Sequence, residues 1–194
     1  RSAAEWILDT TKLSDGYHTL RVVMEAEGVR PVERYVEFRV SNWWFVDDPF
    51  EPPMQAGWFG TIGREKTAEE SAGWRYVEEP FFDTQWRKVR TGNTREYLIW
   101  DTPALQRFSL TLFASTTDLV ETVILEVLAA DTWQAVDYTA SSVEELENGW
   151  YRIVLTGNVG SAVDVTRLKL TITEKAPAAD AVQLVSMHMA GLNR

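Results

Sequence analysis

The sequence predicts an all-β protein built as a β-sandwich, and two observations carry that prediction. Apolar and polar residues alternate with a period of two in one segment after another, which places the apolar members on one face of a half-buried strand. Turn residues such as Gly28, Pro31 and Asn148-Gly149 separate these segments at short intervals. Many strands joined by frequent turns are typical of two packed antiparallel sheets.

The alternation locates the expected strands along the chain. Residues 27–31 contain a glycine and a proline and suit the turn of a hairpin. Residues 181–189 are apolar on both faces, so we expect this last strand at the centre of a sheet. Two segments, 67–70 and 142–146, suit a short helix instead. The other expected strands cover residues 20–26, 36–40, 96–100, 108–114, 123–129, 151–155 and 168–172.

Composition narrows the function classes. The chain has 194 residues, no cysteine, two histidines, nine tryptophans and a net charge of −10. Residues 1–41 hold six basic and seven acidic residues, a balance of −1, and the rest holds 13 and 22, a balance of −9. A nucleic-acid binder needs a basic surface, so we expect no nucleic-acid partner. No apolar run is long enough to span a membrane.

A domain boundary is expected at residue 42, which separates residues 1–42 from residues 43–194. The alternation of the second expected strand stops at Val40, and the acidic, proline-rich stretch 47–53 follows soon after. About 42 residues are too few to bury a sandwich core alone. We therefore expect the first part to be the end of a larger domain, or else a strand pair that leans on the rest.

Residues 9–22 read Asp-Thr-Thr-Lys-Leu-Ser-Asp-Gly-Tyr-His-Thr-Leu-Arg-Val, and residues 38–42 read Phe-Arg-Val-Ser-Asn. Together they resemble the C-terminal half of a bacterial immunoglobulin-like module, in which an Asp-Gly turn leads to a histidine and an alternating strand. The resemblance implies a spacer in a multidomain secreted or cell-surface protein. The front strands of such a module would come from a longer chain or from another chain.

The second part carries another set of motifs, which includes Asp-Asp-Pro-Phe at 47–50, Gly-Trp-Arg-Tyr-Val at 73–77 and Thr-Trp-Gln-Ala-Val at 132–136. These resemble the galactose-binding-like jelly roll, the fold of many carbohydrate-binding modules. The chain departs from that family at Ala130-Asp131, where the family often has Asp-Gly before the tryptophan. The resemblance implies a ligand site in the loops at one end of the sandwich and a structural calcium ion near the first and last strands.

Sugar recognition needs flat aromatic platforms together with planar polar groups that bind pairs of hydroxyls. The segment 86–95 is the richest in both, so the predicted ligand site comprises Trp58, Trp86, Arg90, Asn93 and Arg95. The alternative is that these tryptophans pack under loops and the arginines pair with nearby carboxylates.

Asp47, Asp48 and Glu51 are the candidate calcium ligands, because hard carboxylate oxygens cluster at the expected entry loop. The alternative is that they are ordinary surface carboxylates. Catalysis is not expected: the chain has no cysteine and no nucleophile elbow, and His18 and His188 are its two histidines.

The sequence therefore predicts a non-catalytic carbohydrate-binding module of a larger secreted polysaccharide-degrading protein. Its expected partners are a polysaccharide or oligosaccharide and neighbouring domains or a second chain of the same protein. Two alternatives stay open. One is an accessory β-sandwich that packs on a catalytic domain and binds nothing itself, and the other is a lyase or hydrolase fragment.

Overall fold

A computed structural model describes residues 7–55, 61–62, 65–78, 86–146, 148–160 and 164–193 of the chain. It divides into two compact units, Arg1–Trp44 with Asn193–Arg194, and Phe45–Leu192. Most described residues lie in antiparallel strands, which confirms the predicted all-β class. None of the helices in these ranges is long and apolar enough to cross a membrane.

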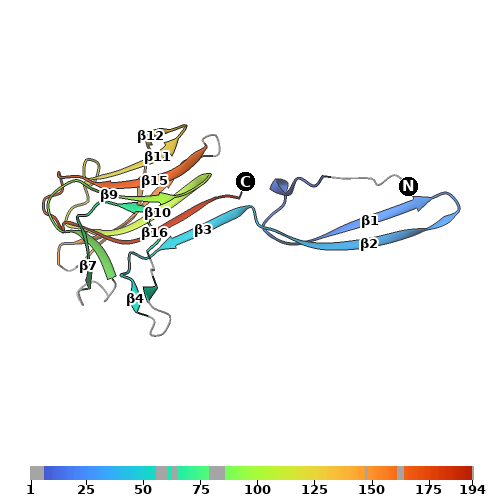
Figure 1. Cartoon of the computed structure of the whole chain (residues 1–194), viewed down its shortest axis with the longest axis horizontal. Helices are drawn as coiled ribbons and strands as arrows, with labels where there is room; N and C mark the ends of the chain where they lie inside the picture. The colour runs from blue at the N-terminus through green and yellow to red at the C-terminus, as the bar shows by residue number, and fades with distance from the viewer. Residues whose placement is uncertain are drawn as a thin grey trace. The chain divides into compact units, whose positions relative to one another are not determined.

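The smaller unit is a long hairpin preceded by one turn of 3-10 helix, η1 (Thr10–Lys12) (Figure 1). Its strands, β1 (Gly16–Ala26) and β2 (Val29–Val40), pair from Gly16 opposite Val40 to Ala26 opposite Val29. Gly28 closes the turn with a positive φ of 74°, a conformation that favours glycine. The predicted hairpin is therefore confirmed.

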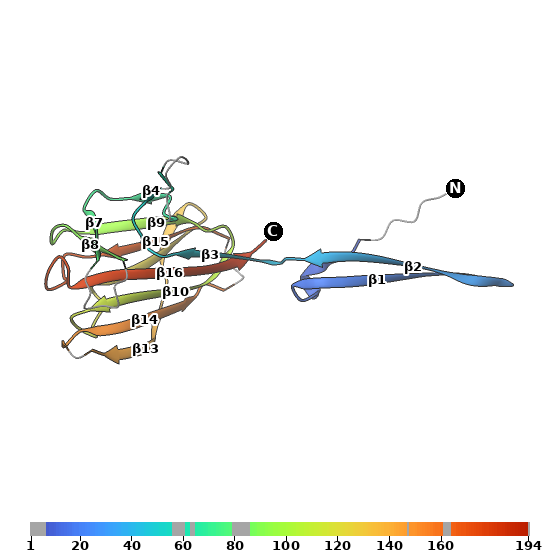
Figure 2. The same ribbon diagram turned by 90° about the horizontal axis from the view of Figure 1, so that it is seen from below.

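The larger unit contains two main sheets, which Figures 1 and 2 show as two layers. The seven-stranded sheet has the order β13-β14-β10-β16-β8-β7, and β3 pairs with β16 beside this path. Its strands are β3 (Trp43–Asp48), β7 (Trp74–Glu78), β8 (Trp86–Arg90), β10 (Leu105–Ala114), β13 (Thr139–Glu145), β14 (Tyr151–Asn158) and β16 (Val182–Leu192).

The five-stranded sheet has the order β12-β11-β15-β9-β6, and a separate pair, β4 with β5, completes the unit. The chain passes repeatedly from one sheet to the other, since β10 and β14 are neighbours in one layer whereas β11 and β12 belong to the other. The strands of the second layer and the small pair are β4 (Met54–Gln55), β5 (Thr61–Ile62), β6 (Glu69–Glu70), β9 (Glu96–Asp101), β11 (Val123–Ala129), β12 (Thr132–Ala135) and β15 (Val165–Ile172).

The core lies between the two sheets and is made of the alternating apolar side chains that the sequence predicted. Leu110 and Leu112 on β10 are fully buried, as are Leu168 and Leu170 on β15. The last strand, β16, pairs with β10 on one side and with β8 on the other, so its predicted central place is confirmed. Trp100 is also buried, as expected for a core tryptophan.

The prediction of short helices in the segments 67–70 and 142–146 is wrong. Glu69 and Glu70 pair with β9 as the edge strand β6. Residues 139–145 form β13, which pairs with β14 along its length and is exposed throughout. An edge strand buries few side chains, so its amino-acid composition can resemble that of a polar helix. Pairing with the neighbouring strand then decides which structure forms.

Gly157 on β14 provides a test of how tightly the layers pack. A Cβ at this position would lie 2.2 Å from the ring of Phe108, which is buried on the neighbouring strand β10. We expect Gly157→Ala to lower the free energy of unfolding by about 1–3 kcal/mol in urea denaturation, because the ring must move within a packed core. Gly92→Ala is the control, since its nearest neighbour would lie at 3.9 Å. Equal stability of the two variants would contradict the tight packing.

Candidate functional site

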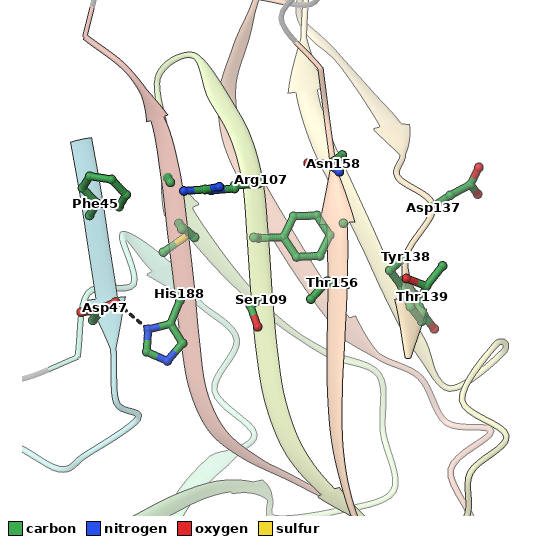
Figure 3. Close-up of a pocket in the computed structure, with 14 residues that line it drawn as sticks. Phe45, Asp47, Arg107, Ser109, Asp137, Tyr138, Thr139, Thr156, Asn158 and His188 are labelled. Carbon is green, nitrogen blue, oxygen red and sulfur yellow. Dashed lines mark hydrogen bonds and ion pairs between the residues drawn. The ribbon is translucent and has the colours of Figure 1, made fainter. Parts of the chain in front are cut away.

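An open groove of about 670 Å³ crosses the face of the seven-stranded sheet that points away from the other layer (Figure 3). Five strands of that sheet, β3, β10, β13, β14 and β16, and the segment before β13 supply its lining. On β10, buried Phe108 and Leu110 alternate with Arg107 and Ser109, which face the groove side. The lining residues are Phe45, Asp47, Arg107, Phe108, Ser109, Asp137, Tyr138, Thr139, Thr156, Gly157, Asn158, His188, Met189 and Ala190.

One row of polar side chains crosses four adjacent strands in register and continues to a fifth strand through a hydrogen bond. Thr139 on β13 is opposite Thr156 on β14, Thr156 is opposite Ser109 on β10, and Ser109 is opposite His188 on β16. His188 then bonds to Asp47 on β3 through Nδ1 and Oδ1, 2.5 Å apart. Neighbouring strands lie about 4.8 Å apart, so the row extends about 19 Å, the length of an oligosaccharide rather than of a single sugar.

A second row lies two residues further along the same strands. Asn158 on β14 is opposite Arg107 on β10, and Arg107 is opposite Ala190 on β16. Phe45 on β3 is 64% exposed and lines the same end of the groove (Figure 3). The two rows place hydroxyl, amide, guanidinium, imidazole and carboxylate groups beside an exposed aromatic ring.

His188 lies between Ser109 and Asp47 in the first row and has contacts on both of its ring nitrogens. Asp47 Oδ1 lies against Nδ1, and Ser186 Oγ lies 3.4 Å from Nε2. The histidine and the aspartate keep 53% and 75% of their side-chain surface exposed. The Nδ1 contact with Asp47 is short and fixes the ring, whereas the Nε2 contact is long, so Nε2 is the nitrogen available to a ligand hydroxyl.

Tyr138 forms the wall of the groove at its β13 end. Its hydroxyl donates to the carbonyls of Leu119 and Val123, at 3.2 and 2.8 Å. Burial, followed by the nearby charge of Asp118, raises the pKa of this phenol above its usual value. The ring is thereby fixed by backbone contacts at its far end, while the rest of the side chain lines the groove.

The groove carries charges of both signs. Asp47 and Asp137 are acidic and Arg107 is cationic. A polyanion would meet two carboxylates here, and a polycation would meet the guanidinium. A neutral ligand rich in hydroxyl groups suits this mixture better than either.

The structure does not bring the four described residues of the predicted loop site together in one surface, although Arg90 and Asn93 are hydrogen-bonded to each other. Trp58 lies outside the described residues. Trp86 begins β8 and Arg90 ends it, so they lie at opposite ends of a five-residue strand. Arg95 is 62% exposed and pairs with Glu174 at 3.4 Å.

Arg90 is buried, with 1% of its surface exposed, and its guanidinium is held inside the protein through both Nη atoms, whereas its buried Nε has no hydrogen-bond partner. It donates to the carbonyls of Thr94 and Thr173 through Nη1, and to Asn93 Oδ1 and the Ala178 carbonyl through Nη2, at 2.6–3.0 Å. Burial lowers the pKa of the guanidinium, with opposing contributions from nearby carboxylates. Arg90 and Asn93 therefore tie three backbone segments together.

The three candidate calcium ligands are also separated. Asp48 is fully buried, and its carboxylate accepts from Trp100 Nε1 at 2.7 Å, Lys66 N at 3.0 Å and Phe50 N at 3.1 Å. Burial raises the pKa of Asp48, and these bonds partly oppose the effect. Asp47 points to the groove instead, and Glu51 is half-buried.

No three His, Asp or Glu side chains of the described residues lie close enough to hold a metal ion together. Consecutive residues of a strand point to opposite faces, which is why the adjacent carboxylates of Asp47 and Asp48 diverge. The calcium site stays a prediction, and any ion bound here would need ligands beyond this pair.

Sequence reasoning missed the groove residues for a specific reason. The apolar members of residues 108–114 predict the strand, but the sequence alone does not show that the polar residues that alternate with them, Arg107, Ser109 and Thr111, share a surface with other strands. Each lies opposite another polar or small residue only because of the strand order, which places β14 and β16 on either side of β10. The alternation itself is visible in the sequence, but the residues that lie beside these positions on the adjacent strands are not.

Comparisons with known proteins place the chain in no family. No protein-family model matches the sequence, and no curated protein is similar enough to count as a relative.

Proposed function

We propose that the chain is a non-catalytic glycan-binding module, and that the groove on the seven-stranded sheet is its binding site. The observation that carries the proposal is the row of five hydrogen-bonding side chains, four of them in register on adjacent strands and the fifth, Asp47 on β3, bonded to His188. Sugar rings present hydroxyls at regular intervals, and a row of fixed donors and acceptors along a groove matches them.

The aromatic lining supports the same ligand class. Phe45 is exposed at one end of the groove, and Tyr138 is held in place at the other. Aromatic rings cover the apolar C–H faces of sugars, and the polar rows supply direction. The mixed charges favour a neutral glycan. Attachment to a larger secreted polysaccharide-degrading protein is part of the proposal and rests on the family resemblances.

The test is a binding panel of neutral and acidic soluble polysaccharides, measured first by affinity gel electrophoresis and then by calorimetry. Tryptophan fluorescence suits this site poorly, because none of the described lining residues is a tryptophan. We expect one or more neutral glycans to bind and the acidic ones to bind less tightly.

A matched pair of variants locates the binding. Asn158→Ala removes an exposed groove amide, and we expect about fivefold to tenfold weaker binding, the effect of one lost hydrogen bond. Asn93→Ala removes an amide of the predicted loop site and should leave the affinity unchanged. A larger loss of affinity for Asn93→Ala than for Asn158→Ala would place the binding site in the loop instead. Binding by neither the parent chain nor the variants would favour the ligand-free accessory sandwich.

A further inference from the structure

The hairpin of β1 and β2 has one polar face and one apolar face. Tyr17, Arg21 and Val23 lie on the polar face, opposite Arg39, Tyr35 and Glu33. Leu20 and Met24 lie on the other face, opposite Val36 and Val32. The alternation therefore sorts the side chains of both strands in the same way.

The polar face is internally paired. Arg21 donates to both carboxylate oxygens of Glu33, at 3.2 and 2.5 Å, and the Tyr35 hydroxyl donates to Glu33 Oε2 at 2.6 Å. The Arg39 guanidinium lies 5.9 Å from the centre of the Tyr17 ring. These groups satisfy one another within the hairpin and in contact with water.

The apolar face is uncovered within its unit. Met24 is 58% exposed, Val36 51%, and Val22 and Val32 more than 40%. Arg34 also belongs to this face, and its guanidinium turns back to donate to the Glu33 carbonyl at 3.1 Å. A two-stranded hairpin is marginally stable in water unless its apolar face packs against something.

The charge of the hairpin favours a second copy of the same chain as the partner. Residues 16–40 contain four arginines and four glutamates, so the hairpin is neutral in a chain whose net charge is −10. Two hairpins can therefore approach without the repulsion that the rest of the chain would produce. A strongly charged partner would gain nothing from this face.

The shape of the face fits the same partner. In a two-fold arrangement the apolar side chains of one copy meet the same face of the other, and, among the described residues that pair in the hairpin, Arg34 is the one charged side chain on this face. Strands of this length and number give a face roughly 37 Å long and two strands wide, and two such faces bury on the order of 900 Å² in total. That is the small end of specific interfaces and corresponds to a weak dimer.

We propose that the apolar face of β1 and β2 is a self-association surface, through which two chains pack hairpin on hairpin as a four-stranded sandwich. The dimer forms at micromolar or higher concentration and joins two glycan-binding units. This proposal is independent of the ligand of the groove.

Sedimentation velocity of the 194-residue chain over a range from low to high micromolar concentration tests the proposal. We expect the mass to rise from one chain to two. Val36→Lys, on the apolar face opposite Leu20, should keep the chain monomeric throughout. Val23→Lys makes the same change on the polar face, opposite Glu33, and should dimerise as the parent chain does.

A mixing experiment separates loss of the interface from loss of the hairpin. Position 36 lies on the apolar face that the proposed two-fold contact buries, so opposite charges placed there in two copies meet across the interface. Val36→Glu and Val36→Lys should each be monomeric alone and form a heterodimer when mixed. A mass of one chain for the parent at every concentration would overturn the proposal, as would equal disruption by Val23→Lys. Failure of the two Val36 variants to combine would also contradict it.

Discussion

Lys88→Ala is expected to lower the free energy of unfolding by about 3–5 kcal/mol, the cost of breaking a buried ion pair from one side. Lys88 is 1% exposed, and its ammonium donates to Glu65 Oε1 at 2.5 Å and to Glu70. The Tyr76 ring lies 5.3 Å from the ammonium, and the Tyr76 hydroxyl donates to Glu65. Without the lysine, the carboxylate of Glu65, which is 11% exposed, is left as a nearly buried charge without its cation.

Chemical denaturation followed by circular dichroism measures the effect of Lys88→Ala. Lys175→Ala is the control, because the pair of Lys175 with Glu121 is 57% and 72% exposed and should contribute nothing measurable. The double variant Lys88→Met with Glu65→Gln removes both charges and should recover much of the loss. A loss for Lys88→Ala as small as that for Lys175→Ala would show that the cluster does not stabilise the fold.

Arg90→Ala is the second large effect, and we expect a loss of about 3 kcal/mol or more in unfolding free energy. The change leaves the buried Thr173 carbonyl and the part-buried carbonyls of Thr94 and Ala178 without their donor, and an unsatisfied buried group carries a desolvation penalty of about 1–3 kcal/mol. It also empties the space of a side chain that is 1% exposed. Arg90→Lys should recover little of it, since one ammonium cannot reproduce a planar fork with several donors.

Arg95→Ala is the matched control for Arg90→Ala. Arg95 is two-thirds exposed and forms one surface pair, so its removal should leave thermal stability nearly unchanged. Similar melting temperatures for both variants would contradict the anchoring role of Arg90. A consequence follows for ligand studies: loss of glycan binding in Arg90→Ala would report misfolding of the 91–95 turn and would say nothing about contact with the ligand.

The strands could be predicted from the sequence because their core faces are encoded locally. The period-two alternation alone predicts the strands that contain Leu110 and Leu112, and Leu168 and Leu170. The edge strands β6 and β13 could not be predicted in this way. They bury little, so the sequence contains few apolar positions to mark them, and their pairing partners decide their conformation.

The candidate site was less accessible to sequence reasoning, for two physical reasons. First, arginines and asparagines in a loop resemble a ligand site in the sequence whether they face solvent or the protein interior. Arg90 faces the interior because it bonds to the carbonyls of Thr173 and Ala178, which lie 83 and 88 residues further along the chain. The groove rows depend on the strand order and on register, which join Thr139, Ser109 and His188 from three parts of the chain.

The central claim is that a glycan binds in the groove, and amide chemical-shift mapping tests it most directly. The ¹⁵N-labelled chain would be titrated with the neutral oligosaccharide of the glycan that the binding panel selects. The account predicts that the largest shifts fall on Ser109, Thr156, Asn158 and His188, which belong to three adjacent strands. Shifts concentrated in residues 91–95, with the groove amides unmoved, would contradict it.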